Sequence, residues 1–322
     1  MADDGVASRR LAIEAIERIE TGGAYANLVV PSLLGASDLS DRDRGFVTEL
    51  VYGSTRMARA LDFLFARFLE RDEVEPRVRG ALRIGTYQLV FLGTPAHAAV
   101  DATVAATPKR ARGFVNAILR RVADAGSEIA WPNDPIRLSY PDWIVALLLE
   151  DLGERAMPVL EAMNEPATVH TRPDGYRQDP ASAEVAALVD VAPDSVVVDL
   201  CAAPGGKATY IAGEPATGPT VIGADVHPHR ARLVATAARD TGTAVHPMVA
   251  DGRHAPVRAR SVDAVLIDAP CSGLGSLRRR PDARWRIEPT DIETLRELQF
   301  DLVRAGCELV RPGGLLVFSV CT

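Results

Sequence analysis

From residue 195 onward, short apolar runs rich in β-branched residues alternate with stretches of helical periodicity. Runs that are apolar throughout are typical of strands buried on both faces. Buried strands separated by helices pair in parallel through right-handed crossovers. The pattern therefore predicts a doubly wound α/β domain. The runs occupy residues 195–200, 220–226, 244–250, 262–268 and 314–320.

The N-terminal third of the chain has a different pattern, in which helical periodicity is not interrupted by strand-like alternation. Helices are expected at 7–24, 42–70, 77–91, 97–106 and 111–124, with prolines and glycines between them. We therefore expect an all-helical domain over 1–125 and the α/β domain over 183–322. The intervening 126–182 is rich in proline, and we interpret it as a connecting segment with one helix at about 141–164.

The composition narrows the class of protein. No apolar run reaches the length of a membrane-spanning helix, and the acidic start MADDGVASRRL is unlike a secretory signal. The chain has four cysteines, none of them in a close pair with metal-ligand spacing, and its six histidines do not cluster with them. We expect a cytoplasmic protein with reduced thiols, no bound metal and no membrane partner, acting as a monomer.

The charge is unevenly distributed. The net charge is −7, yet residues 77–121 hold eight basic side chains against one acid, and residues 272–286 hold five arginines against one acid. A basic stripe on an acidic protein can still dock a phosphate backbone, although each stripe could equally be a solvated helix face. The arginines that we predict to contact RNA are Arg110, Arg112, Arg120, Arg278, Arg279 and Arg280.

A glycine-rich loop follows the first apolar run, in the sequence DLCAAPGGK. Glycines let a ligand approach the backbone closely, and the helix that follows presents free amide groups. Asp225 lies at the end of the second run and can accept hydrogen bonds from ribose hydroxyls, while Asp251 follows the third run and Asp268 ends the fourth. This arrangement predicts a nucleoside-cofactor site, and its loop residues are Cys201, Ala202, Ala203, Pro204, Gly205, Gly206 and Lys207.

Two further cysteines follow the last two apolar runs. Cys271 comes after Asp268-Ala269-Pro270, and Cys321 comes after Ser319-Val320. A thiolate can add to carbon 6 of a pyrimidine and make carbon 5 nucleophilic, and a carboxylate near the ring nitrogen can stabilise the adduct. A second group must then assist elimination. Two thiols and Asp268 meet these needs, although the chemistry alone does not say which thiol attacks.

These motifs resemble a known family. DLCAAPGGK, DAPCSG and SVCT resemble the cofactor motif and the two cysteine motifs of the RNA cytosine carbon-5 methyltransferases. DRDRGFVTELVYGSTR, LRIGTYQLVFL, PAHAAVDATV and GFVNAILRR resemble the NusB-like RNA-binding domain. A NusB-like domain joined to this methyltransferase is the arrangement of the bacterial Sun/RsmB family, which modifies a cytosine in small-subunit ribosomal RNA.

The resemblance implies a class I, Rossmann-like methyltransferase domain that uses S-adenosyl-L-methionine, with ribosomal RNA as its partner. It implies that residues 201–207, with Asp225, Asp251 and Asp268, hold the cofactor. It also implies that Cys321 is the nucleophile, that Cys271 assists elimination and release, and that Lys207 steadies the cofactor or the base.

The sequence departs from the family in two places. VHTRPDGYRQDPAS, residues 169–182, stands where the family usually has an additional small α+β segment. The chain also ends one residue after Cys321, where the family continues into further strands, so we expect the last strand to be an edge. We therefore expect either a fragment of a longer protein or a weakened enzyme. The alternative function is that of an RNA-binding module whose truncated methyltransferase domain is inactive. The basic helical region disfavours a methyltransferase acting on DNA or protein.

Overall fold

The computed structural model describes residues 2–70, 73–126, 128–213 and 218–321. The chain folds as two compact units. One comprises Met1–Pro166 and Ser276–Arg286, and the other comprises Ala167–Gly275 and Ile287–Thr322. The chain therefore leaves the first unit after Pro166, returns to it after Gly275 and leaves it again after Arg286.

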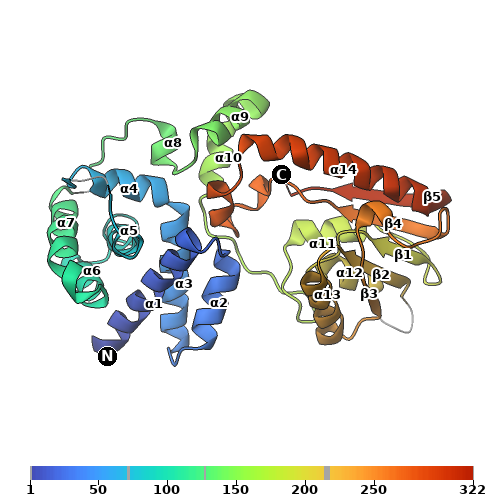
Figure 1. Cartoon of the computed structure of the whole chain (residues 1–322), viewed down its shortest axis with the longest axis horizontal. Coiled ribbons are helices and arrows are strands. Elements are labelled where there is room, and N and C mark those ends of the chain that lie inside the picture. Colours follow the sequence, from blue (N-terminus) through green and yellow to red (C-terminus); the bar gives the residue numbers. More distant parts are fainter. Residues whose placement is uncertain (1, 71–72, 127, 214–217, 322) are drawn as a thin grey trace. The chain divides into compact units, whose positions relative to one another are not determined.

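Helices build the first unit around one hydrophobic core (Figure 1). Ser40 caps one helix by accepting a hydrogen bond from the Asp43 amide, and Pro76 starts another at a position that needs no amide donor. The expected helix 42–70 is two helices, because the backbone turns at Met57. The helices are α1 (Ala2–Thr21), α2 (Ala26–Gly35), α3 (Asp41–Arg56), α4 (Ala58–Ala66), α5 (Pro76–Val90), α6 (Ala96–Ala106), α7 (Arg112–Asp124), α8 (Asp134–Arg137), α9 (Asp142–Leu152) and α10 (Ala156–Ala162).

The segment Ser276–Arg286 lies in the α/β part of the sequence but packs within the helical unit. Arg284 is fully buried, its Nη1 donates to Asn164 Oδ1 at 2.8 Å, and its guanidinium lies 4.0 Å from the ring centroid of Tyr140. The indole of Trp285 donates to the Thr55 carbonyl at 2.7 Å. This segment lies within residues 183–322, which the sequence predicts as the α/β domain.

The second unit contains a parallel sheet. Within the described residues its five strands have the order β3-β2-β1-β4-β5, and every neighbouring pair is parallel. This architecture confirms the predicted fold class of an all-helical unit followed by a Rossmann-like parallel sheet. The strands are β1 (Val196–Asp199), β2 (Thr220–Asp225), β3 (Val245–Val249), β4 (Val262–Asp268) and β5 (Val310–Ser319).

Helices cover both faces of this sheet (Figure 1). Alternate strand residues point to opposite faces, so Val197 and Leu266 pack in one apolar cluster and Val198 and Ile267 in the other. Helices α11 (Pro180–Ala187), α12 (Gly206–Ala212) and α13 (Pro228–Thr241) contribute to the first cluster, and α14 (Pro289–Leu309) contributes to the second. Burial on both faces explains why the inner strands β1 and β4 are mainly apolar, whereas the edge strands β3 and β5 carry exposed residues such as Pro247 and Arg311.

Candidate active site

Polar side chains gather where the strands of the second unit end. Asp199, Asp225, Asp268 and Ser319 are the last residues of β1, β2, β4 and β5. Because these strands are parallel neighbours, their carboxyl ends lie at one edge of the sheet. Ligands of open α/β sheets bind outside this edge, so these four side chains mark the site.

The glycine-rich loop leaves β1 at the same edge. The Ala202 amide donates to the Ala224 carbonyl at 2.8 Å, which holds the loop against β2. Gly205 has φ +114°, and a Cβ atom there would lie 2.8 Å from the Cβ of Ala237. A side chain is therefore excluded at Gly205 by both conformation and space. Only glycine, which has no side chain, fits this close to α13.

Two of the predicted cofactor acids, Asp225 and Asp251, pair with arginines. Asp225 is buried, and its carboxylate accepts from the His227 amide at 3.0 Å and pairs with Arg230 Nε at 3.0 Å. Asp251 pairs with the adjacent Arg253 at 2.6 Å, and hydrogen bonds from Arg253 lower the pKa of Asp251 to about 2. Both acids are therefore held as oriented acceptors.

Asp199 is an acid of the site that the sequence interpretation did not single out. It is 1% exposed, and its Oδ1 accepts from the Cys201 amide at 3.2 Å. Its Oδ2 has no hydrogen-bond partner among the described residues. Burial raises the pKa of Asp199 to about 7, because desolvation disfavours the charged form. The signal that could have identified it is the one used for Asp225 and Asp268, namely an acid at a strand end.

The two predicted catalytic thiols lie together. Cys271 Sγ and Cys321 Sγ are 3.0 Å apart. The hydrogen bond from Cys321 lowers the pKa of Cys271 to about 6, although burial acts in the opposite direction. The Gly275 amide donates to the Cys321 carbonyl at 3.1 Å, which ties the loop containing Cys271 to the end of β5. The contact between the two sulfur atoms therefore favours the thiolate form of Cys271.

A charged pair accompanies the thiols. Lys207 Nζ lies 2.5 Å from Asp268 Oδ2, and Ser319 Oγ donates to Asp268 Oδ1 at 2.8 Å. The Ala269 amide also donates to the Ser319 carbonyl at 2.9 Å. These contacts connect the cofactor loop, β4 and β5. Lys207 therefore links the predicted cofactor residues to the predicted catalytic residues.

The other two cysteines have different surroundings. Burial raises the pKa of Cys201 to about 12, so this thiol stays protonated at neutral pH. Cys307 is exposed on α14, away from the strand ends.

The predicted RNA-binding arginines of the first unit differ in availability. Arg110 pairs with Glu75 at 2.8 Å, and Arg120 donates to Asn116 at 3.0 Å on the same helix. Arg112 donates to the carbonyls of Thr107 and Ala105 at 3.1 and 2.8 Å. Its guanidinium therefore closes the turn before α7, which leaves less of it for RNA than the sequence suggested.

The second predicted cluster also lies in the first unit. Arg278 donates to the carbonyls of Glu165 and Pro166 at 3.4 and 3.2 Å. Arg279 and Arg280 are exposed.

The described residues lack two kinds of structural feature. They contain no helix long and apolar enough to cross a membrane. They also contain no group of three or more acidic, histidine or cysteine side chains arranged to hold a metal ion.

Comparison with known proteins decides the family. Residues 186–322 match the family model "16S rRNA methyltransferase RsmB/F", and residues 6–124 match that of the NusB family. The chain is 35% identical to ribosomal RNA small subunit methyltransferase B of Thermus thermophilus, over 98% of this chain and 83% of the relative. The chain belongs to the RsmB family of rRNA methyltransferases. The corresponding protein of Salmonella newport is 28% identical over 98% of this chain and 86% of its own length.

Among solved structures, the crystal structure of PH0851 superposes with a TM-score of 0.77 at 21% identity, covering 99% of this chain and 86% of that one. This similarity confirms the fold. Membership of the family confirms the resemblance noted in the motifs, and with it S-adenosylmethionine as the cofactor and rRNA methylation as the activity class.

The loop and its acids fit that cofactor. S-adenosylmethionine carries ribose hydroxyls, an adenine amine and an amino acid ammonium, all of which are hydrogen-bond donors. Asp225 and Asp251 hold oriented acceptor oxygens, and the buried Oδ2 of Asp199 is an acceptor without a protein donor among the described residues. The side-chain-free turn at Gly205 leaves room for close backbone approach.

Proposed function

We propose that this protein methylates carbon 5 of a cytosine in small-subunit ribosomal RNA through a covalent cysteine adduct. The observation that supports this most is the pair of thiols 3.0 Å apart beside the Lys207–Asp268 pair. One thiol is required to attack a pyrimidine ring, a second group to assist elimination, and a carboxylate to act on the ring nitrogen. We further propose that the protein acts as a monomer in the cytoplasm.

The residues proposed to hold the cofactor are 201–207 with Asp225, Asp251 and Asp268. Asp225 would accept from the ribose hydroxyls, since its carboxylate is already oriented by His227 and Arg230. Asp251 would accept from the adenine edge. When bound, S-adenosylmethionine supplies the methyl group as an electrophile. Lys207 would stand between cofactor and base, paired with Asp268.

The first step is the attack of Cys321 on carbon 6 of the cytosine. The Cys321 proton passes to the hydrogen-bonded sulfur of Cys271, the sulfur–carbon bond forms, and the electron pair of the ring double bond moves toward carbon 5. A proton from the Lys207 ammonium passes through the Asp268 carboxylate to ring nitrogen 3, and it returns by the same contact when the ring double bond re-forms. Lys207 and Asp268 lie within hydrogen-bond reach of one another, so a proton can pass between them.

The last step releases the RNA. The half-buried Cys271 first returns its proton to solvent and then, as the thiolate, removes the proton from carbon 5. The ring double bond re-forms and the bond between carbon 6 and Cys321 breaks. Cys321 leaves as the thiolate, so the pair again holds one proton.

The assignment of the two thiols rests on the family resemblance. The pKa of about 6 at Cys271 favours a thiolate there, and a thiolate can act either as a nucleophile or as a base, so the family resemblance decides between the two roles. Cys321 supplies the hydrogen bond that stabilises this thiolate, so it gives up its proton along the same contact when it attacks. Exchanging the two roles would require Cys271 to attack while Cys321 removes the carbon-5 proton.

RNA recognition is assigned to the helical unit and to the arginines that follow Cys271. Arg279 and Arg280 are exposed and lie in the segment Ser276–Arg286, which packs with the NusB-like helices. Their charges can neutralise phosphates and release counterions.

The proposal is tested by incubating the purified protein with unmodified small-subunit ribosomal RNA and isotopically labelled S-adenosylmethionine. Nucleoside analysis by mass spectrometry should find the label in 5-methylcytidine. Label in another nucleoside would overturn the carbon-5 assignment. Binding of RNA and cofactor without transfer would favour an RNA-binding module.

A further inference from the structure

A tight turn precedes the cofactor loop in the second unit, within the sequence VHTRPDGYRQDPAS. Thr171 and Arg177 form an antiparallel bridge, and the Arg172 amide donates to the Tyr176 carbonyl at 2.9 Å. Gly175 closes the turn with φ +86°. The backbone at Arg172 is therefore fixed by the hydrogen bonds of a short turn, which restricts where its side chain can lie.

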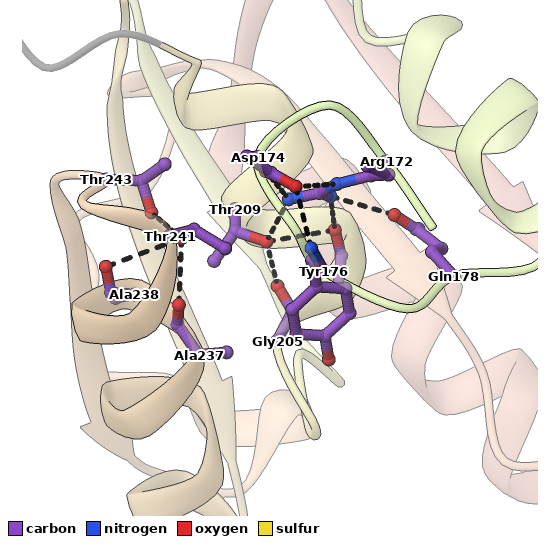
Figure 2. Close-up of polar contacts among 11 residues, drawn as sticks. Arg172, Asp174, Tyr176, Gln178, Gly205, Thr209, Ala237, Ala238, Thr241 and Thr243 are labelled. Carbon is purple, nitrogen blue, oxygen red and sulfur yellow. Dashed lines mark hydrogen bonds and ion pairs between the residues drawn. The ribbon is translucent and has the colours of Figure 1, made fainter. Parts of the chain in front are cut away.

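The guanidinium of Arg172 makes contacts in two directions (Figure 2). Within the turn it pairs with Asp174 and donates from Nη1 to Gln178 Oε1 at 2.8 Å. Toward α12 it donates from Nη1 to the Gly206 carbonyl at 2.8 Å and from Nη2 to Thr209 Oγ1 at 3.1 Å. The planar fork of arginine can satisfy these acceptors together, whereas a lysine has one ammonium to share among them.

Aromatic rings enclose the same guanidinium. Its carbon lies 4.9 Å from the ring centroid of Tyr176 and 5.7 Å from that of Tyr210. The Arg172 side chain is 8% exposed, so water competes little for its donors. Tyr176 also covers the loop itself, because a Cβ atom at Gly206 would lie 2.9 Å from Tyr176 Cε1.

The contacts continue into the cofactor loop. Thr209 Oγ1, which accepts from Arg172, donates in turn to the Gly205 carbonyl at 2.9 Å. Figure 2 shows this sequence of contacts from Arg172 through Thr209 to Gly205. Arg172 thus holds Gly206 directly and Gly205 through Thr209. Ordering two adjacent glycines costs conformational entropy. Because Arg172 already orders Gly205 and Gly206, a ligand that binds this turn loses less free energy to ordering the backbone.

We propose that Arg172 is a positioning residue for S-adenosylmethionine, which locks the Gly205–Gly206 turn in its binding conformation. The inference rests on the proposed function, in which residues 201–207 hold the cofactor. Arg172 acts through Gly206 and Thr209. Asp174, Gln178, Tyr176 and Tyr210 hold Arg172 in turn.

The test compares variants of the full chain at a temperature where each is folded, as established by thermal melting. Calorimetry measures the affinity for S-adenosylmethionine of the parent, Arg172→Ala, Arg172→Lys and the control Arg177→Ala. Arg177 is an exposed arginine of the same turn, so its replacement removes an equal charge at a matched place. Hydrogen exchange of the amides in residues 203–209 reports on the loop directly.

The expected result is a loss of affinity of tenfold or more in Arg172→Ala, with faster exchange in 203–209 and no more than a twofold change in Arg177→Ala. Arg172→Lys should lose an intermediate amount, and it decides the matter if Arg172→Ala does not fold. Affinity and exchange equal to the parent in a folded Arg172 variant would overturn the proposal, even if the melting temperature fell. A parent chain that does not bind S-adenosylmethionine would instead overturn the cofactor assignment.

Discussion

Cys271 and Cys321 are 50 residues apart in the chain, yet their sulfur atoms lie 3.0 Å apart. The pairing of β4 with β5 explains this, since each cysteine follows the end of one of the two strands. The Gly275 amide, bonded to the Cys321 carbonyl, fixes the second thiol against the loop of the first. Two thiols at this distance act as one titrating unit.

The contact between the two sulfur atoms predicts an unusual thiol titration. Since the pKa of Cys271 is lowered to about 6, its thiolate should predominate above that pH, and the rate of alkylation should rise through a midpoint near 6 instead of the usual value of about 8.5. Replacing Cys321 by Ala removes the stabilising hydrogen bond and should raise the midpoint. Peptide mass spectrometry after timed iodoacetamide pulses, in a Cys307→Ala background, measures it. A midpoint that is the same with and without Cys321 would contradict the coupling.

Removing the Asp225 carboxylate should weaken cofactor binding. Loss of a charge-assisted hydrogen bond to the ribose should cost about 1–3 kcal/mol, or roughly five- to 150-fold in affinity. Calorimetric titration of Asp225→Ala with S-adenosylmethionine measures the change. Asp240→Ala is the matched control, since Asp240 is an exposed acid of the adjacent helix α13. Equal affinities in parent and Asp225→Ala would remove Asp225 from the site.

Much of the second unit could be predicted because its signals are local. The run 262–268 is β4 residue for residue, since continuous apolar β-branched sequence is what a strand buried on both faces requires. The positions of Asp225, Asp268, Cys271 and Cys321 at strand ends followed from the same periodicity. What the periodicity could not give is distance, such as the 2.5 Å between Lys207 and Asp268.

The contacts that escaped prediction join segments far apart in the sequence. Arg284 reaches Asn164 across 120 residues, and Arg172 reaches Gly206 across 34. Neither arginine stands in a repeating pattern, so the sequence offered no sign that the first is buried and the second enclosed by rings. The basic stripe predicts an RNA contact at Arg112, and it gives no sign of the carbonyl partners at Ala105 and Thr107, because those depend on how the backbone turns before α7.

Asp199 should make stability depend on pH. Its pKa is about 7 in the folded chain and about 4 in the unfolded chain, so the folded state binds more protons between these values. Stability from this group is therefore full below about pH 4 and lost as pH rises to about 7, by a few kcal/mol at most. Melting of Asp199→Asn against the parent checks this. The variant should gain relative to the parent between pH 5 and pH 8, and a constant difference would mean that Asp199 is charged throughout.

Docking of ribosomal RNA should depend on salt through Arg279 and Arg280. Affinity should fall as salt rises, and the log–log slope should decrease by about 1 for each of these arginines replaced by Ala. Arg112→Ala is the internal comparison, because that side chain is committed to backbone carbonyls and should leave the slope nearly unchanged. Filter binding at several salt concentrations gives the slopes. A slope unaffected by both replacements would show that Arg279 and Arg280 do not contact the RNA phosphates.

The most direct test of the mechanism separates the two thiols by the fate of the RNA. Small-subunit ribosomal RNA is incubated with S-adenosylmethionine and with the parent, Cys271→Ala or Cys321→Ala, and the products are resolved on denaturing gels. If Cys321 attacks and Cys271 assists release, Cys271→Ala should accumulate a protein–RNA adduct that survives denaturation, and Cys321→Ala should give neither adduct nor methyl transfer. An adduct trapped in Cys321→Ala and absent from Cys271→Ala would contradict the assignment and exchange the roles of the two cysteines.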